Sequence, residues 1–358
     1  TERGHSATIC SLIPSYRTKI MSSYIKNNFR CLPEILSEQG YTTTFIQGHP
    51  RLTFDNTGNF MRRIGFHHVL SMDETFVKPD EQPYVWGWGL QDDKFYQKTF
   101  GYLDKLREVD PQAKLFTMMA TISNHQGFDE MPDEQKYIFP FPKSFKENFI
   151  NSMNLADKYL ETFFQELDRR GWRDDSLVII MGDHGFPTGM RQNVSNEMGF
   201  YNELFRVPLI VMWGNKIRPA RIKNFAFSQI DVAPSIVDWL GINTSTPFVG
   251  KSLPLSQAEA ERVADLVPIL QPYDGVYLGT VFHPWKYMKS LSTGEEYLFH
   301  LGDDPMESHN LIDNPKLQEK VSRLKQGLKR IYLNQRLLRE DRLYPPSVAS
   351  ETRYIPHR

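Results

Sequence analysis

The chain has few cysteines, no long apolar run and no excess of charge of either sign. Only Cys10 and Cys31 are present among 358 residues. Two cysteines are too few for the disulfide framework of a small secreted scaffold, so two free, buried thiols are expected. No apolar stretch approaches the roughly 20 residues that cross a bilayer. Lysine and arginine together number 42 against 43 aspartates and glutamates, so no basic surface is indicated and nucleic acid is not an expected partner.

The composition is that of a globular protein with a large core. Hydrophobic residues make up 40% of the chain, which at this length is enough for one large α/β domain with a smaller C-terminal part. Amphipathic helices are expected at 31–40, 145–170 and 316–342, each with apolar residues near helical spacing. The β-branched run 42–46 predicts a strand directly after the first of these helices.

The most informative stretch is Leu177 to Gly189, which reads LVIIMGDHGFPTG. Its apolar run predicts a fully buried parallel strand that delivers Asp183 and His184 into a turn flanked by glycines. Ligands in open α/β sheets collect beyond such strand ends, and a carboxylate beside an imidazole suits Mn, Zn or Mg. Taken alone, an Asp-His pair is more often a helix cap or a surface turn.

Further motifs follow in order along the chain. Together with Gly-Asp-His-Gly they resemble the signature of the sulfatase and alkaline phosphatase superfamily. The matching segments are 201–211 (YNELFRVPLIV), 231–242 (DVAPSIVDWLGI), 250–253 (GKSL), 285–287 (WKY) and 298–311, with its Asp-Pro and Asn-Leu pairs. The resemblance implies a doubly wound, mostly parallel α/β sheet flanked by helices, as in alkaline phosphatase, with a small C-terminal α+β subdomain. The expected division is a catalytic domain over 1–255 and a hairpin and helix subdomain over 256–358.

The start of the chain resembles the nucleophile position of this superfamily. Sulfatases place a cysteine there, followed by a proline and an arginine at fixed spacing, and Cys10 lacks that spacing because Pro14 and Arg17 lie too far along. Thr1 instead resembles the threonine nucleophile of the lipoteichoic acid synthase and phosphoglycerol transferase branch. The simpler alternative is that Thr1 only caps a helix. The family's first strand, with an acidic metal ligand, would lie upstream of Thr1, so the chain is expected to be an N-terminally truncated piece.

The resemblance also implies a set of site residues. Thr1 and His125 are the expected catalytic residues, and Thr1, Asp183 and His184 the expected ligands of one divalent metal ion. Mn²⁺ is the first candidate, with Ca²⁺, Mg²⁺ and Zn²⁺ as alternatives. The expected substrate contacts are His49, Asp55, Asn56, Trp86 and Lys286. Asp55 and Asn56 also fit a plain Asx turn, and Trp86 a core residue.

The predicted function is a metal-dependent phosphoester hydrolase or phosphoglycerol-type transferase acting on a small-molecule, lipid or glycan phosphoester. The first alternative is a sulfatase-like hydrolase of sulfated sugars. The absence of lysine between 192 and 215, where sulfatases carry one, argues against it. The second alternative is an inactive homologue that binds a glycan or lipid. The family resemblance implies an extracytoplasmic location, with membrane anchoring possible through a region upstream of Thr1.

Overall fold

The computed structural model describes residues 1–344 except 74, 190 and 192. Its central element is a three-stranded parallel sheet in the order β2 (His68–Ser71), β1 (Tyr41–Gln47) and β5 (Lys114–Ala120). Side chains alternate along a strand, so neighbouring residues of β1 point to opposite faces. Both Phe45 and Ile46 are fully buried, which shows that both faces of this sheet are covered.

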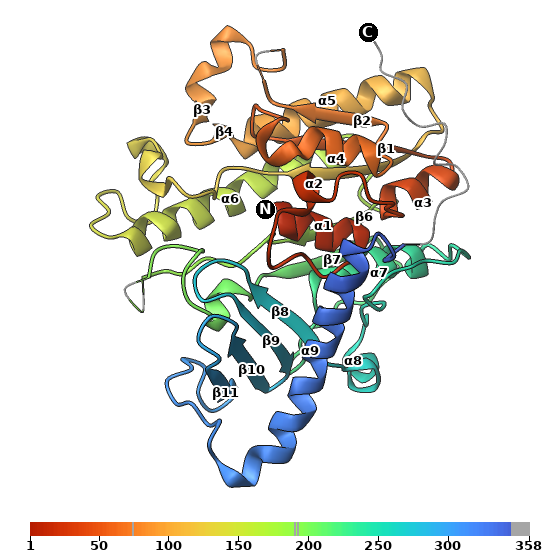
Figure 1. Cartoon of the computed structure of the whole chain (residues 1–358). Helices are drawn as coiled ribbons and strands as arrows, with labels where there is room; N and C mark the ends of the chain where they lie inside the picture. The colour runs from red at the N-terminus through yellow and green to blue at the C-terminus, as the bar shows by residue number, and fades with distance from the viewer. Residues whose placement is uncertain (74, 190, 192, 345–358) are drawn as a thin grey trace.

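The helices divide between the two faces of the parallel sheet (Figure 1). Phe45 packs with residues of α1, α2 and α4, whereas Ile46 packs with residues of α5 and α6. This arrangement confirms the predicted doubly wound α/β architecture. The helices of this part are α1 (Glu2–Cys10), α2 (Ile20–Ser23), α3 (Leu32–Glu38), α4 (Thr57–Arg63), α5 (Asp92–Val109), α6 (Phe145–Arg169) and α7 (Val232–Trp239). Two short strands, β3 (Val85–Trp86) and β4 (Gly89–Leu90), pair with each other beside them.

The strand before the Asp-His turn differs from its prediction. It forms where expected, as β6 (Leu177–Met181), but it pairs antiparallel with β7 (Leu209–Trp213). All five of its residues are half-buried rather than fully buried. A continuous apolar run marks a strand without revealing the direction of its neighbour, so the expectation of a fully buried parallel strand was wrong.

The C-terminal part is an antiparallel sheet covered by one long helix (Figure 1). Its strands, in the order β11 (Glu296–His300), β10 (Trp285–Ser290), β9 (Tyr277–Phe282) and β8 (Val267–Gln271), follow the short helix α8 (Gln257–Val263). Helix α9 (Gln318–Arg339) packs Leu324, Leu328 and Ile331 onto this sheet. The predicted division at 255/256 stays a prediction, since residues of α1 belong to the same apolar cluster as this sheet.

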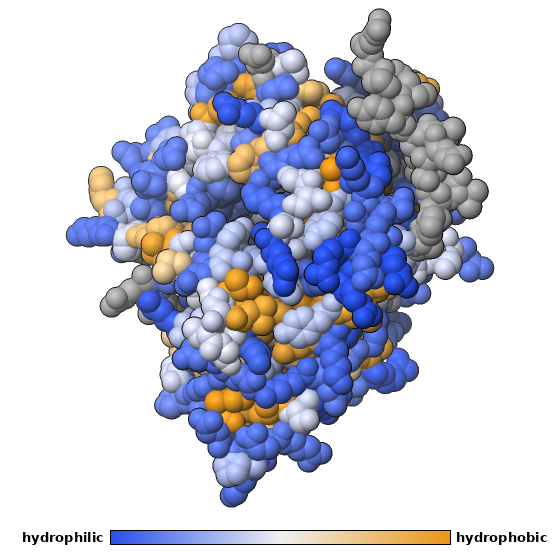
Figure 2. Space-filling model, viewed as in Figure 1, coloured by the Kyte–Doolittle hydropathy of each residue, from blue (hydrophilic) through white to orange (hydrophobic). Residues whose placement is uncertain are grey.

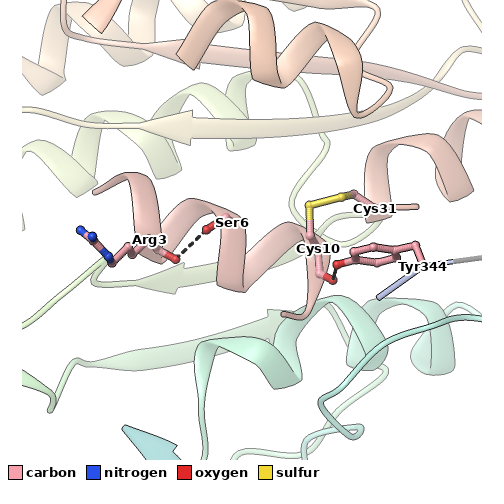
Figure 3. The surroundings of a disulfide bond; sticks show 5 residues. All are labelled: Arg3, Ser6, Cys10, Cys31 and Tyr344. Carbon is pink, nitrogen blue, oxygen red and sulfur yellow. Dashed lines mark hydrogen bonds between the residues drawn. A yellow bond between two sulfur atoms is a disulfide. The ribbon is translucent and has the colours of Figure 1, made fainter. Parts of the chain in front are cut away.

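Helix α9 also reaches the first helix of the chain. The Asn334 carboxamide donates to the Ile13 carbonyl at 2.6 Å and accepts from the Ile13 amide at 3.3 Å. Just beyond α9, the Tyr344 hydroxyl donates to the Cys10 carbonyl at 2.7 Å (Figure 3). The end of the described chain is therefore hydrogen-bonded to the segment that begins it.

The two cysteines are not free thiols. Cys10, the last residue of α1, forms a disulfide with Cys31, the residue that precedes α3 (Figure 3). The expectation of two free thiols was therefore wrong, because the sequence does not show that these two helix ends meet. Both cysteines are fully buried. The crosslink fixes the end of α1 to the start of α3.

Removing this crosslink should destabilise the protein. A disulfide that closes a loop of 21 residues is expected to contribute about 3 kcal/mol, mainly by restricting the unfolded chain. We expect the double variant Cys10→Ala/Cys31→Ala to lose that amount in urea-induced unfolding. Wild type unfolded and refolded with dithiothreitol should match the variant. Titration of two free thiols in the native, unreduced protein would contradict this prediction.

The apolar residues are mostly internal. The face drawn in Figure 2 is largely hydrophilic, with apolar residues in small separate patches. Among residues 1–344 that the structure describes, no helix has the length and apolar character needed to cross a membrane.

Candidate active site

The site is built on the turn after β6. Two backbone hydrogen bonds close this turn against the segment before β7: Gly182 N–H donates to Pro208 at 3.3 Å, and Gly185 N–H donates to Leu204 at 3.1 Å. Within the turn, the His184 N–H donates to Asp183 Oδ1 at 2.9 Å. These bonds fix the backbone that carries Asp183 and His184, and they leave Asp183 Oδ2 available to face outward.

Helix α1 lies directly against this turn. A Cβ atom on Gly4 would lie 2.4 Å from the Asp183 carbonyl oxygen, so only glycine permits this approach. The approach brings the amino group of Thr1 to 3.5 Å from Asp183 Oδ2. Thr1 is the N-cap residue of α1, yet its side chain makes no capping hydrogen bond. A purely capping role therefore does not describe this threonine.

The two predicted metal ligands of this turn point toward each other. The His184 Nδ1 lies 2.9 Å from the Gly185 carbonyl, so Nδ1 is the nitrogen that donates there and Nε2 is the nitrogen directed to the site. That Nε2 lies 3.6 Å from Asp183 Oδ2. A carboxylate oxygen, an imidazole nitrogen and a threonine hydroxyl form a donor set that fits Mn²⁺, Mg²⁺ or Zn²⁺. The described residues contain no cluster of three or more His, Cys, Asp or Glu placed to hold a metal ion.

Charges around Asp183 favour its ionised form. Burial alone would raise the pKa of its carboxyl, but His184, the side chain of Thr1 and His5 together lower the pKa below its usual range. His5 lies inside α1, and burial lowers its pKa to about 4, so the imidazole is neutral at neutral pH. The site thus holds an ionised carboxylate beside the neutral imidazole of His5, and the ionised form of a carboxyl is the one that ligates a metal ion.

His125 lies near this group on the loop after β5. Burial lowers its pKa, whereas its hydrogen bond to Gln126 and the Asp183 carboxylate act in the opposite direction, so His125 lies within the electrostatic field of Asp183. Its Nδ1 lies 3.1 Å from the Gln126 carbonyl. With the proton on Nδ1, Nε2 is left as a proton acceptor.

Aromatic rings adjoin His125. The Trp88 ring centroid lies 4.5 Å from that of His125 and 6.0 Å from that of His49. Phe54 completes this cluster, 5.3 Å from His49 and 5.9 Å from Trp88. Trp88 and Phe54 are 41% and 49% exposed, respectively, so an apolar surface borders the site. Of the predicted substrate contacts, His49 belongs to this cluster.

Asp92, the first residue of α5, holds the loop that carries His125. Its Oδ1 accepts from the backbone N–H groups of Ile122 at 2.8 Å and Ser123 at 3.1 Å. In return, the Ser123 hydroxyl accepts from the Asp92 N–H at 2.8 Å. The carboxyl is almost completely buried, and burial raises its pKa to about 6 in spite of these hydrogen bonds.

The raised pKa of Asp92 predicts a pH dependence of stability. Because the pKa is about 6 in the folded state against 3.8 for an unperturbed aspartate, the folded protein binds this proton more tightly than the unfolded chain. Binding of this proton therefore stabilises the folded state by roughly 2–3 kcal/mol. This stabilisation is fully present below pH 4 and is lost as the pH rises through 6. We expect Asp92→Asn to remove this part of the pH profile, measured as the difference in free energy of unfolding between pH 4 and 8. An unchanged profile would contradict the prediction.

Two predicted substrate contacts, Asp55 and Asn56, have side-chain partners within the protein, and a third, Trp86, lies outside the aromatic cluster. The Asp55 carboxylate lies 2.5 Å from Lys19 Nζ. Asn56 donates to the Met21 carbonyl of α2 at 2.8 Å, a bond between distant segments rather than a local Asx turn. The half-buried Trp86 has an indole N–H without a partner among the described residues, and the ring that joins the cluster at His125 is that of Trp88.

Lys286 is not exposed to a substrate. It lies on β10, is fully buried, and pairs with Glu307 at 2.6 Å while donating to the Phe200 carbonyl at 2.8 Å. Burial lowers the pKa of Lys286 to about 8, despite the nearby carboxylate. A side chain with no accessible surface cannot reach an incoming ester, so we assign Lys286 a structural role in place of the predicted substrate contact.

Comparison with known proteins identifies the family. A sequence profile described as Sulfatase matches residues 5–242. The chain belongs to the sulfatase family. The matched range includes His125, Asp183 and His184 but begins after Thr1. The relatives named below, a lipoteichoic acid synthase and a phosphoglycerol transferase, are enzymes of this superfamily.

Two curated relatives indicate the branch. The chain is 26% identical to lipoteichoic acid synthase 2 of Bacillus subtilis over 264 residues, which cover 71% of the chain and 39% of that protein. It is 24% identical to phosphoglycerol transferase I of Escherichia coli over 164 residues, which cover 46% of the chain and 21% of that protein. The match thus spans about two fifths of the first relative and about one fifth of the second.

Solved structures confirm the fold of this sulfatase-family chain. A Vibrio parahaemolyticus protein of the alkaline phosphatase superfamily superposes with a TM-score of 0.74 at 20% identity, covering 96% of this chain and 76% of that one. The lipoteichoic acid synthase LtaP of Listeria monocytogenes gives 0.69 at 20% identity, with 95% and 78% covered. A sulfatase-like protein of Bacteroides fragilis, yidJ, gives 0.70 at 17% identity, with 94% and 86% covered.

Proposed function

We propose that this chain is the catalytic part of a phosphoester-cleaving hydrolase or phosphoglycerol-type transferase with Thr1 as nucleophile. The supporting observation is the position of Thr1. Helix α1 brings it to the Asp183 carboxylate, with the amino group 3.5 Å from Oδ2, and its side chain is not used to cap the helix. A bound divalent cation would lower the pKa of a ligating hydroxyl and neutralise charge on a phosphoryl oxygen.

The neighbouring side chains supply orientation and proton transfer. Asp183 and His184 would hold the cation, because their Oδ2 and Nε2 atoms converge at 3.6 Å. His125 is neutral at neutral pH, with Nδ1 tied to the Gln126 carbonyl. Its Nε2 is therefore available to accept a proton from a hydroxyl and return it later.

The proposed reaction has two steps: the phosphoryl group is first transferred to Thr1 and then to an acceptor. In the first, Thr1 Oγ forms a bond to phosphorus while the bond from phosphorus to the leaving alcohol breaks, and His125 carries the threonine proton to that alcohol. In the second, water or another alcohol attacks the phosphothreonine, His125 takes its proton, and this proton restores the Thr1 hydroxyl. Positioning and charge neutralisation account for most of the rate of phosphoryl transfer, so few further groups are needed.

The residues of this site also favour one metal ion, one class of substrate and one cellular compartment. Mn²⁺ is the first candidate because the donor set is oxygen-rich with one imidazole. The exposed Trp88 and Phe54 rings suit the apolar faces of a glycan or lipid headgroup. A disulfide persists in oxidising compartments, so the Cys10–Cys31 bridge supports an extracytoplasmic site. Anchoring to a membrane through a region outside this chain is part of the proposal.

The test is turnover by the full-length protein with Mn²⁺ and three aryl substrates: a phosphodiester, a phosphomonoester and a sulfate ester. We expect cleavage of a phosphoester and loss of that cleavage with a chelator. Preferential cleavage of the sulfate ester would establish the sulfatase alternative instead. If no ester is cleaved but a glycan or lipid phosphate binds, the inactive binding homologue is the correct description.

A further inference from the structure

A glutamine from a distant segment holds the backbone of the metal-ligand turn. Gln229 begins the short 3-10 helix Gln229–Asp231, 46 residues after Asp183. Its Nε2 donates to the Gly182 carbonyl at 2.9 Å and to the Asp183 carbonyl at 2.7 Å. Both hydrogens of one amide group are thus used on two successive carbonyls, which sets the orientation of the peptide planes on either side of Asp183.

The backbone of Gln229 is itself fixed. The Ser228 N–H donates to Asp231 Oδ2 at 2.8 Å, and the Ser228 hydroxyl caps the 3-10 helix. The carbonyl of the next residue, Ile230, accepts from the Ser11 hydroxyl at 2.6 Å. Ser11 ends helix α1, whose first turn carries Thr1. One anchored segment therefore contacts both the nucleophile helix and the metal-ligand turn.

We propose that Gln229 is a positioning residue that sets the geometry of Asp183 and His184 toward a divalent cation. This inference rests on the proposed metal site. Glutamine is suited to the task because it presents two donors from one nitrogen at this reach. An ionised glutamate would place negative charge against two carbonyl oxygens, and leucine would leave both carbonyls without this donor.

The test measures cation binding directly, by titrating the full-length protein with Mn²⁺ and following free Mn²⁺ by electron paramagnetic resonance. Outer contacts of this kind typically change metal affinity by about 10–100-fold. We expect Gln229→Leu and Gln229→Glu to raise the Kd for Mn²⁺ by that factor. Phosphoester turnover should recover in part at saturating Mn²⁺, because the variants remain folded and differ from wild type in their affinity for Mn²⁺.

Gln318→Leu is the matched control. Gln318 also donates from Nε2 to two carbonyls, those of Ile312 at 2.9 Å and Asn314 at 3.1 Å, but it lies at the start of α9. Its replacement should leave the Kd for Mn²⁺ unchanged. If wild type binds Mn²⁺ and Gln229→Leu binds it equally well at equal thermal stability, the inference is overturned. If wild type binds no Mn²⁺, the proposed metal site itself fails.

Discussion

Replacing Thr1 with alanine is expected to reduce phosphoester turnover by roughly 10³–10⁶-fold, the range found when a covalent nucleophile is removed. The reason is that both hydroxyls within α1 are engaged along the helix: Ser6 donates to the Arg3 carbonyl at 3.1 Å and Thr8 to the Gly4 carbonyl at 2.8 Å. The measurement is the kcat of the full-length protein with Mn²⁺ and an aryl phosphodiester, at substrate concentrations above KM.

Two further variants make the Thr1 result interpretable. Thr1→Ser keeps the hydroxyl, so this variant should retain measurable turnover. Its covalent phosphoenzyme intermediate should also be trapped. Thr8→Ala removes a threonine hydroxyl from the same helix and should leave kcat within about threefold. Turnover by Thr1→Ala at the wild-type rate would show that the nucleophile lies elsewhere.

The second large effect concerns stability. Lys286→Met is expected to destabilise the protein by about 3–5 kcal/mol, because it leaves the Glu307 carboxylate buried without its cation. Both side chains of this pair are almost fully buried, at 0% and 1% exposed. Glu307 also accepts from the Asn202 N–H at 2.5 Å. If the unpaired carboxylate moves away, this hydrogen bond breaks and the segment that leads to Leu204 is released. The measurement is the free energy of unfolding in urea.

A neighbouring ion pair provides the control. Lys289, on the same strand, pairs with Glu296 at 3.3 Å, and the two side chains are 35% and 24% exposed. Lys289→Met should cost no more than about 1 kcal/mol, as for other solvent-exposed pairs. The double variant Lys286→Met/Glu307→Gln should recover much of the loss, because the amide keeps an acceptor for Asn202 without a buried charge. Equal losses for both lysine variants would contradict this account.

The parts of the site that are local in the sequence were predictable. Asp183 and His184 are neighbours, and the glycines around them mark a turn, so their convergence follows from the chain itself. The pair Trp86 and Trp88 shows where such reasoning stops. Residues two apart in extended backbone share a face, but a turn at Gly87, where φ is +57°, breaks that relation. The sequence therefore signals an aromatic site contact without telling which tryptophan provides it.

Features that depend on distant segments could not be predicted in this way. Gln229 acts through hydrogen bonds to backbone carbonyls. Every residue has a carbonyl, so the sequence does not mark which ones Gln229 will contact. The disulfide depends on the packing of α1 against α3, and the burial of Lys286 depends on a carboxylate 21 positions later. The doubly wound sheet itself was predictable because the order of the motifs resembles that of a known superfamily, and the fold came with that resemblance.

The hydrogen bonds that join Asn334 of α9 and Tyr344 beyond it to the segment 10–13 have a consequence for the order in which this part of the chain folds. Asn334 meets Ile13 across 321 positions, and Tyr344 meets Cys10 across 334. Contacts of such long separation form late, because all the residues between the two partners must be available before they close. Helix α1, which follows Thr1, therefore acquires its complete surroundings only when α9 docks. The proposed site should become competent in that late step of folding.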